Sequence, residues 1–74
     1  MSKLPVIKSQ ELLKALKKMG FFEFHQVGSH LQMKHADGRR ATIPVHRGKD
    51  VPRGTLHAIL KQIGVAGEEL VQNL

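Results

Sequence analysis

Residues 21–45, FFEFHQVGSHLQMKHADGRRATIPV, contain two turn signals that divide them into three strand-like runs. In the first signal, Gly28-Ser29, glycine occupies the first central position of a two-residue type II′ hairpin turn. Such a turn predicts strands over residues 21–27 and 30–35. It would pair residues 27, 26, 25, 24 and 23 with residues 30, 31, 32, 33 and 34, in that order.

Side chains alternate across a sheet, so this register sorts the hairpin into two faces. We expect the apolar face to lie against the core. The members of this face are Phe22, Phe24, Leu31 and Met33. The polar face would hold Glu23, His25, His30, Gln32 and Lys34.

The second turn signal, residues 36–38, sets the position of a third strand. A two-residue loop there would place apolar residues on the polar face. A three-residue loop with Gly38 in a left-handed conformation keeps the faces consistent, because it pairs residue 33 with 41 and residue 31 with 43. We therefore predict a third strand over residues 39–45, with Arg40 and Thr42 on the face of His30.

Helical periodicity flanks the three strands. Apolar residues repeat at helical spacing over residues 9–19, where Ser9 is the expected N-cap and Gly20 the stop. A second apolar stripe starts near Pro52, with Thr55 as the expected N-cap, and ends at Gly64. A last short helix is expected over residues 66–73. Residues 1–8 are expected to form a short lead-in that lacks the apolar core of a signal peptide.

Two amphipathic helices can cover only one face of a three-stranded sheet. The order of elements therefore predicts one two-layer α+β domain over residues 1–74, α-β-β-β-α with a short C-terminal helix. The face that carries His30 would stay open.

Composition limits the classes of function. The 74 residues include no cysteine, which excludes disulfides and thiolate metal sites, and no apolar run approaches the roughly 18 residues of a membrane span. A net charge of +6 favours a polyanionic partner, above all nucleic acid. With three phenylalanines and neither tryptophan nor tyrosine, the composition argues against a platform that stacks single-stranded bases. We expect a cytoplasmic protein.

His30 is the strongest candidate for chemistry, because it follows a tight turn on the open face. An imidazole exchanges protons near neutral pH, and RNA carries its own nucleophile in the 2′-hydroxyl. A ribonuclease therefore needs a base and positive charge rather than serine or cysteine. Lys34 and Arg40 would neutralise the phosphate, while Lys34, His25 and water stay open as the second proton carrier. The RNA-contacting candidates are Lys34, Arg40, His25, Gln32, Arg47 and Lys49.

The five histidines are spread over four expected elements and lack the spacing of metal ligands, so we expect neither a metal nor another cofactor. His35 should point toward the helices or the sheet edge, away from His30.

Several motifs together are similar to those of the HicA, or YcfA-like, family of bacterial toxins. They are Gly20-Phe21, Gln26-Val27-Gly28-Ser29-His30, Pro44-Val45-His46, Gly54-Thr55-Leu56 and the run over residues 59–64. The resemblance implies a double-stranded-RNA-binding-like fold and ribosome-independent cleavage of mRNA that arrests growth. It also implies that His30, the histidine of the Gly-Ser-His element, is catalytic.

The same resemblance implies a HicB-type antitoxin that covers the active face, and contact with operator DNA only through that antitoxin. Members of the family often carry a basic residue at the position that Val27 occupies here. Two other functions remain open from the residues alone. One is a non-catalytic module that binds duplex RNA, and the other is a basic face that only docks an acidic protein.

Overall fold

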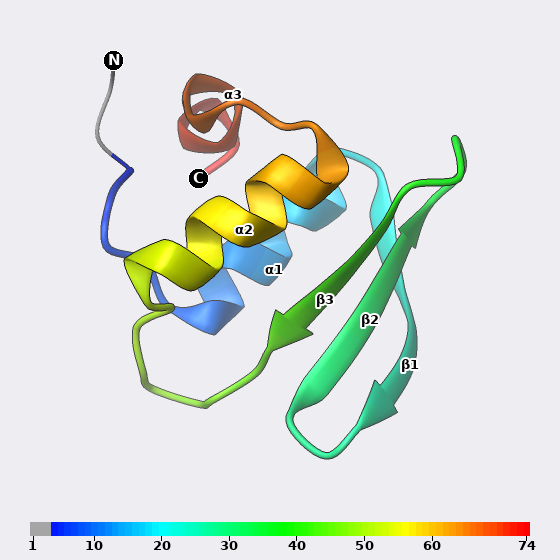
Figure 1. The fold of residues 1–74 in the computed structure, drawn as a ribbon, viewed down its shortest axis with the longest axis horizontal. Helices are drawn as coiled ribbons and strands as arrows, with labels where there is room; N and C mark the ends of the chain where they lie inside the picture. The colour runs from blue at the N-terminus through cyan, green and yellow to red at the C-terminus, as the bar shows by residue number, and fades with distance from the viewer. Residues whose placement is uncertain (1–3) are drawn as a thin grey trace.

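The computed structural model describes residues 4–74, which form a two-layer α+β fold (Figure 1). The elements in chain order are α1 (Ser9–Lys18), β1 (Phe21–Val27), β2 (His30–His35), β3 (Arg40–Pro44), α2 (Arg53–Ile63) and α3 (Gly67–Gln72). Within the described residues, the strands make one antiparallel sheet in the order β1-β2-β3. Helices α1 and α2 lie against one face of this sheet, which confirms the predicted double-stranded-RNA-binding-like architecture.

Both turns have the predicted geometry. Gly28 has φ +58°, and only glycines have positive φ among the described residues, so Ser29 completes the φ pattern of a type II′ turn. Gly38 has φ +99° and closes the three-residue loop, where the His35 backbone N–H donates to the Arg39 carbonyl at 2.9 Å. The predicted pairs of residues 33 with 41 and 31 with 43 are confirmed.

The predicted register of β1 holds from Val27 back to His25 and is wrong beyond it. Phe24 is an extra residue in a β-bulge, so that Glu23 pairs with Met33, and Phe22 pairs with Lys34. The bulge reverses the faces of the first half of the strand. As a result, the two phenylalanines expected in the core are partly exposed, Phe22 at 49% and Phe24 at 39%.

Phe21 takes their place in the core, where it is 3% exposed and meets the His35 ring edge-on at a centroid distance of 5.0 Å. Residues 21 and 25 would share a face in a regular strand, so only an extra residue lets Phe21 point inward while His25 keeps its place in the hairpin. Glu23 consequently leaves the polar face where we expected it, and forms an ion pair with Lys17 of α1 at 2.5 Å.

The helix stops are as predicted, but the N-caps are not. Gly20 follows the C-cap of α1 with φ +100°, and Gly64 ends α2 in a left-handed conformation. Ser9 is the first residue of α1 rather than its N-cap, because its buried hydroxyl instead donates to the Pro44 carbonyl at 3.0 Å. Thr55 lies inside the first turn of α2, since that helix already begins at Arg53 after Pro52.

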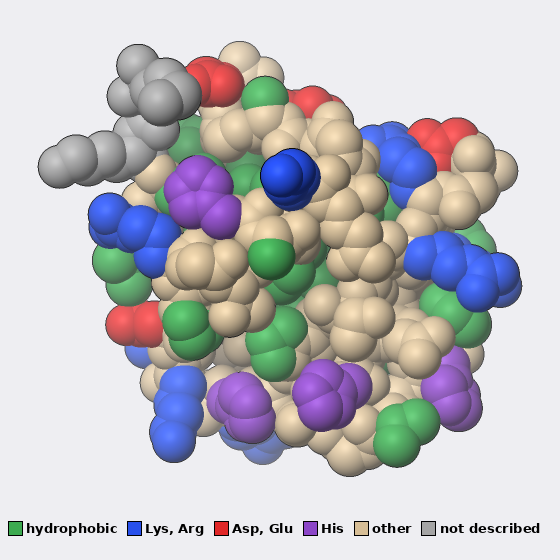
Figure 2. Space-filling model, viewed as in Figure 1, with side chains coloured by type: hydrophobic (Ala, Val, Ile, Leu, Met, Phe, Trp, Pro, Cys, Tyr) green, Lys and Arg blue, Asp and Glu red, His purple; other side chains and the backbone are tan. Residues whose placement is uncertain are grey.

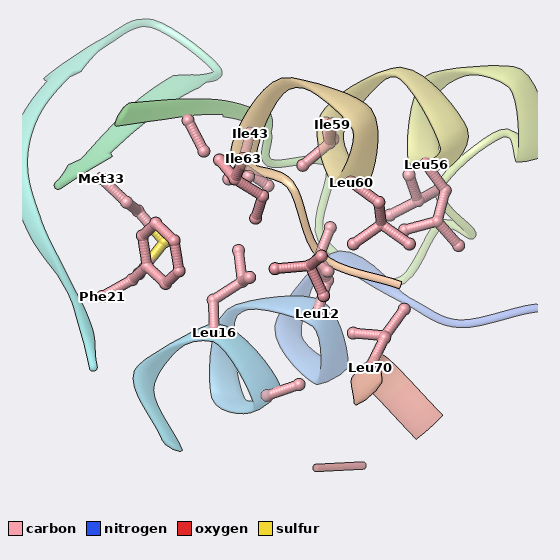
Figure 3. Close-up of a cluster of buried hydrophobic side chains, with 14 of the residues drawn as sticks. Leu12, Leu16, Phe21, Met33, Ile43, Leu56, Ile59, Leu60, Ile63 and Leu70 are labelled. Carbon is pink, nitrogen blue, oxygen red and sulfur yellow. The ribbon is translucent and has the colours of Figure 1, made fainter. Parts of the chain in front are cut away.

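The core fills the space between the sheet and the helices (Figure 3). Leu12 and Leu16 of α1 point toward Leu60 and Ile63 of α2 there, and α3 adds Leu70. Residues 4–8 are part of this fold rather than a lead-in: the side chains of Leu4 and Ile7 are buried. The predicted lead-in also includes residues 1–3, which lie outside the described residues. In residues 4–74, none of the helices combines the length and the apolar character needed to cross a membrane.

Candidate functional site

The open face of the sheet brings together five of the residues that the sequence singled out. His30, Gln32 and Lys34 alternate along β2 with the buried Leu31 and Met33, so they point away from the helices. His25 lies opposite Gln32, and Arg40 lies opposite Lys34, which places both on the same face.

His30 is exposed and stands directly after the Gly28-Ser29 turn, as the first residue of β2. Its cross-strand partners are Val27 and Pro44, neither of which carries charge or a hydrogen-bonding side chain. The turn is tied to the end of β3, since the Val45 N–H donates to the Ser29 carbonyl at 2.6 Å. The backbone around His30 is thus held on both sides while its imidazole faces solvent.

The candidate residues lie at two ends of the open face, with the histidines near the hairpin turn and Lys34 and Arg40 at the other end of β2. His25 is the diagonal cross-strand neighbour of His30, a relation that places side chains about 7–8 Å apart. Lys34 lies four residues further along β2, about 13 Å away at 3.3 Å per residue, and Arg40 lies beside it. His30 therefore lies nearer to His25 than to Lys34 or Arg40.

Lys34 and Arg40 instead gather around the bulged Phe24. The Lys34 Nζ lies 4.3 Å from the centroid of the Phe24 ring, and the Arg40 Cζ lies 6.0 Å from it. The His25 ring is 6.5 Å from that of Phe24 and inclined to it by 34°. No feature of the sequence marked Phe24 as a surface residue, because a bulge leaves no signal in the hydrophobic pattern.

Arg47 and Lys49 lie on the loop between β3 and α2 rather than on the sheet face. That loop leaves the sheet beside the Gly28-Ser29 turn, so it belongs to the His30 end. His46 is also exposed on this loop, and was not among our site residues although it belongs to the Pro44-Val45-His46 motif. Figure 2 shows histidine side chains along the lower edge of the molecule, over this loop and the nearby hairpin turn, with Lys and Arg beside them.

The electrostatics of the face favour an anionic ligand. In the described part of the chain, Glu23 is the one acidic residue within a strand, and its carboxylate is turned to Lys17 of α1. Asp37 lies in the turn between β2 and β3. There the Arg39 backbone N–H donates to it at 3.0 Å and the Arg39 Nε at 2.7 Å, which lowers the pKa of the Asp37 carboxyl. The sheet face itself therefore carries cations without a carboxylate.

His35 has a structural role, as its predicted direction suggested. Its Nε2 donates to the Met19 carbonyl at 3.1 Å, and its Nδ1 accepts from the Asp37 N–H at 3.1 Å. Both ring nitrogens are thus engaged at the sheet edge, away from His30. Across residues 4–74, no group of three or more histidine or acidic side chains is arranged to hold a metal ion. A hollow of 360 Å³ between α2 and α3 includes none of the predicted site residues.

Comparison with known families identifies the chain. Residues 9–65, from the start of α1 to just beyond α2, match the family model described as HicA toxin of bacterial toxin-antitoxin systems. The chain belongs to the HicA toxin family. The matched region includes the whole sheet with His30, and family membership implies that the toxin pairs with an antitoxin. No curated protein matches the chain.

Proposed function

We propose that this HicA-family chain is a single-domain endoribonuclease that cleaves mRNA independently of the ribosome, and so blocks translation and arrests growth in the cytoplasm. The observation that supports this function most directly is the position of His30. It is exposed on an open sheet face that carries cations and no carboxylate, where the phosphates of RNA can approach. The imidazole supplies the proton transfer that RNA cleavage requires.

In this proposal, the 2′-hydroxyl of the substrate attacks the adjacent phosphorus and displaces the 5′-oxygen of the next nucleotide. One group takes the proton of the 2′-hydroxyl and another gives a proton to the leaving 5′-oxygen. The products carry a 2′,3′-cyclic phosphate and a 5′-hydroxyl. His30 performs one of these transfers.

His25 is the best-placed second group, because it is the diagonal neighbour of His30 while Lys34 lies about 13 Å along the strand. Gln32 lies between the two histidines on the same face and can hydrogen-bond the phosphate or a ribose hydroxyl. Arg47 and Lys49, on the loop at the His30 end, would contact the RNA backbone.

The test is incubation of antitoxin-free protein with a long RNA, without added metal, followed by analysis of the new ends. We expect His30→Ala to abolish cleavage and His25→Ala to slow it by about 10²–10⁴-fold. His57→Ala is the matched control, since His57 is an exposed histidine on α2 away from the sheet face, and should cleave normally.

New 5′-phosphate ends would contradict the proposed mechanism and indicate hydrolysis by an activated water. RNA left intact by folded, antitoxin-free protein would contradict the enzymatic function itself and favour a non-catalytic RNA-binding module.

The antitoxin partner in this proposal is a HicB-type protein that covers the open face and so excludes RNA. Operator DNA is contacted only through that antitoxin. An acidic antitoxin surface would complement the cations of the sheet face.

A further inference from the structure

Two of the three phenylalanines, Phe22 and Phe24, lie partly exposed on the open face of the sheet. Phe24 is the more distinctive, because it is the extra residue of the β-bulge. Exposure forgoes the gain in free energy that burying a phenylalanine supplies, and β-bulges commonly re-aim a side chain at functional positions. The position of Phe24 therefore points to a ligand.

The surroundings of Phe24 specify the chemistry of that ligand. The Lys34 Nζ lies 4.3 Å from the ring centroid, and the Arg40 guanidinium is next to it. An exposed aromatic ring beside cations, on a face without carboxylates, combines the two components that bind single-stranded nucleic acid: a ring on which a base stacks and charges that bind the backbone. An apolar protein surface would not require both cations so close to the ring.

We propose that Phe24, Lys34 and Arg40 form a subsite that stacks one unpaired RNA base and binds its phosphate, about 13 Å along β2 from His30. The proposal rests on the proposed function only in taking RNA as the ligand. It assigns a separate role to the Lys34 end of the open face, which is to hold a nucleotide some distance along the strand from the cleaved bond.

The subsite makes the toxin selective for single-stranded RNA. In a duplex each base is already stacked between its neighbours and paired, so its face is not available to a ring mounted on a sheet. An unpaired base can turn outward and stack on Phe24. The composition argued against such a platform because it includes neither tryptophan nor tyrosine and only three phenylalanines, yet two of these three lie on the open face.

The test measures binding rather than cleavage. His30→Ala protein is titrated with a short single-stranded RNA that contains 2-aminopurine, and separately with the same RNA annealed to its complement. Adding Phe24→Ala should weaken single-strand binding by about five- to a hundred-fold, remove the fluorescence change caused by stacking, and leave duplex binding within about two-fold.

Phe24→Tyr should restore binding, because tyrosine also presents an aromatic face. Val71→Ala is the control for loss of an exposed apolar side chain, since Val71 lies on α3 and is exposed. Lys34→Gln and Arg40→Gln should each reduce the slope of log affinity against log salt concentration by about 0.7, the value for one phosphate contact on a single strand.

Unchanged single-strand binding by the Phe24→Ala protein overturns the proposal, and so does an equal loss for single-stranded and duplex RNA. If Phe24→Ala instead weakens only the complex with the antitoxin, the ring belongs to a protein interface and the proposal is also overturned. Cleavage by the protein with His30 intact is followed in parallel. Loss of the proposed enzymatic function is thereby distinguished from loss of the stacking subsite.

Discussion

Glycine is required at position 20 for two reasons: the backbone has a positive φ, and there is no space for a side chain. Its φ is +100°, and a Cβ there would lie 2.7 Å from the His35 Nε2. The imidazole cannot easily move, because that nitrogen donates to the Met19 carbonyl and the ring packs against Phe21. Gly38 offers a matched comparison, since its φ is +99° and no atom lies within 4 Å of the corresponding Cβ position.

We therefore expect Gly38→Ala to lower the free energy of unfolding by about 1–3 kcal/mol through backbone strain alone. Gly20→Ala should cost at least about 1 kcal/mol more, because the side chain also displaces His35. Urea unfolding of both variants gives the comparison. Equal losses of stability would show that His35 moves aside freely.

Asp37 makes the stability of the fold depend on pH. Hydrogen bonds from Arg39 lower the pKa of the Asp37 carboxyl in the folded state, below the value of 3.8 expected without them. A carboxyl with a depressed pKa stabilises the fold above its unfolded pKa, and that contribution is lost as the pH falls through the folded pKa.

The stability difference between the parent protein and Asp37→Asn should thus be constant from neutral pH down to about 5, and shrink below about 4. Unfolding experiments across this range measure it. A difference that grows toward acid pH would contradict the assigned cause.

At the scale of elements, Ser9 connects α1 to the loop that follows β3. It is the one polar residue that is buried among residues 4–74, at 2% exposed. Its hydroxyl donates to the Pro44 carbonyl at 3.0 Å and accepts from the His46 N–H at 3.5 Å. Pro44 lies opposite His30, so this contact supports the end of the sheet where we place the chemistry.

Ser9→Ala should lower the free energy of unfolding by about 1–3 kcal/mol, because it leaves the Pro44 carbonyl without its donor. Amide hydrogen exchange should also rise in the loop over residues 45–52 more than in α2. Ser29→Ala, at a half-buried position in the hairpin turn between β1 and β2, serves as the control. Unaltered exchange in the loop would mean that Ser9 does not hold it.

In the whole molecule, the core that stabilises the fold and the candidate site lie on opposite faces of the sheet. The buried side chains lie between the sheet and the helices, whereas the candidate site occupies the uncovered face of the sheet (Figures 1 and 3). A domain of this size has a stability of roughly 4–11 kcal/mol, so one large cavity removes a substantial share of it.

Leu60→Ala should therefore cost about 2–5 kcal/mol, while His30→Ala should change stability by less than about 0.5 kcal/mol. Thermal and urea unfolding of the two variants test this separation of layers. A large loss of stability in His30→Ala would show that the imidazole is structural, and would remove the support for its catalytic role.

Local signals were sufficient for much of this fold. Gly28 and Gly38 set their turns because the required φ values are accessible to few other residues, and the helical stripes predicted α1 and α2. Alternation then determined the register of β2 against β3 and placed His30, Gln32, Lys34 and Arg40 on one face. These features depend on residues close in sequence, or on a turn that brings two strands together in a single way.

Which apolar residues are buried depended on contacts between residues that are distant in the sequence. Phe21 and Phe24 carry the same side chain, and their order in the chain does not say which of them is buried. The Phe21 ring packs between His35 and Arg39, and the bulge that follows turns Phe24 outward. The burial of Leu4 and Ile7 and the pairing of Ser9 with Pro44 likewise depend on contacts that form only when the layers pack. Turns and periodicity are properties of the local chain, whereas the choice among equivalent apolar side chains is made by the space that the packed layers leave.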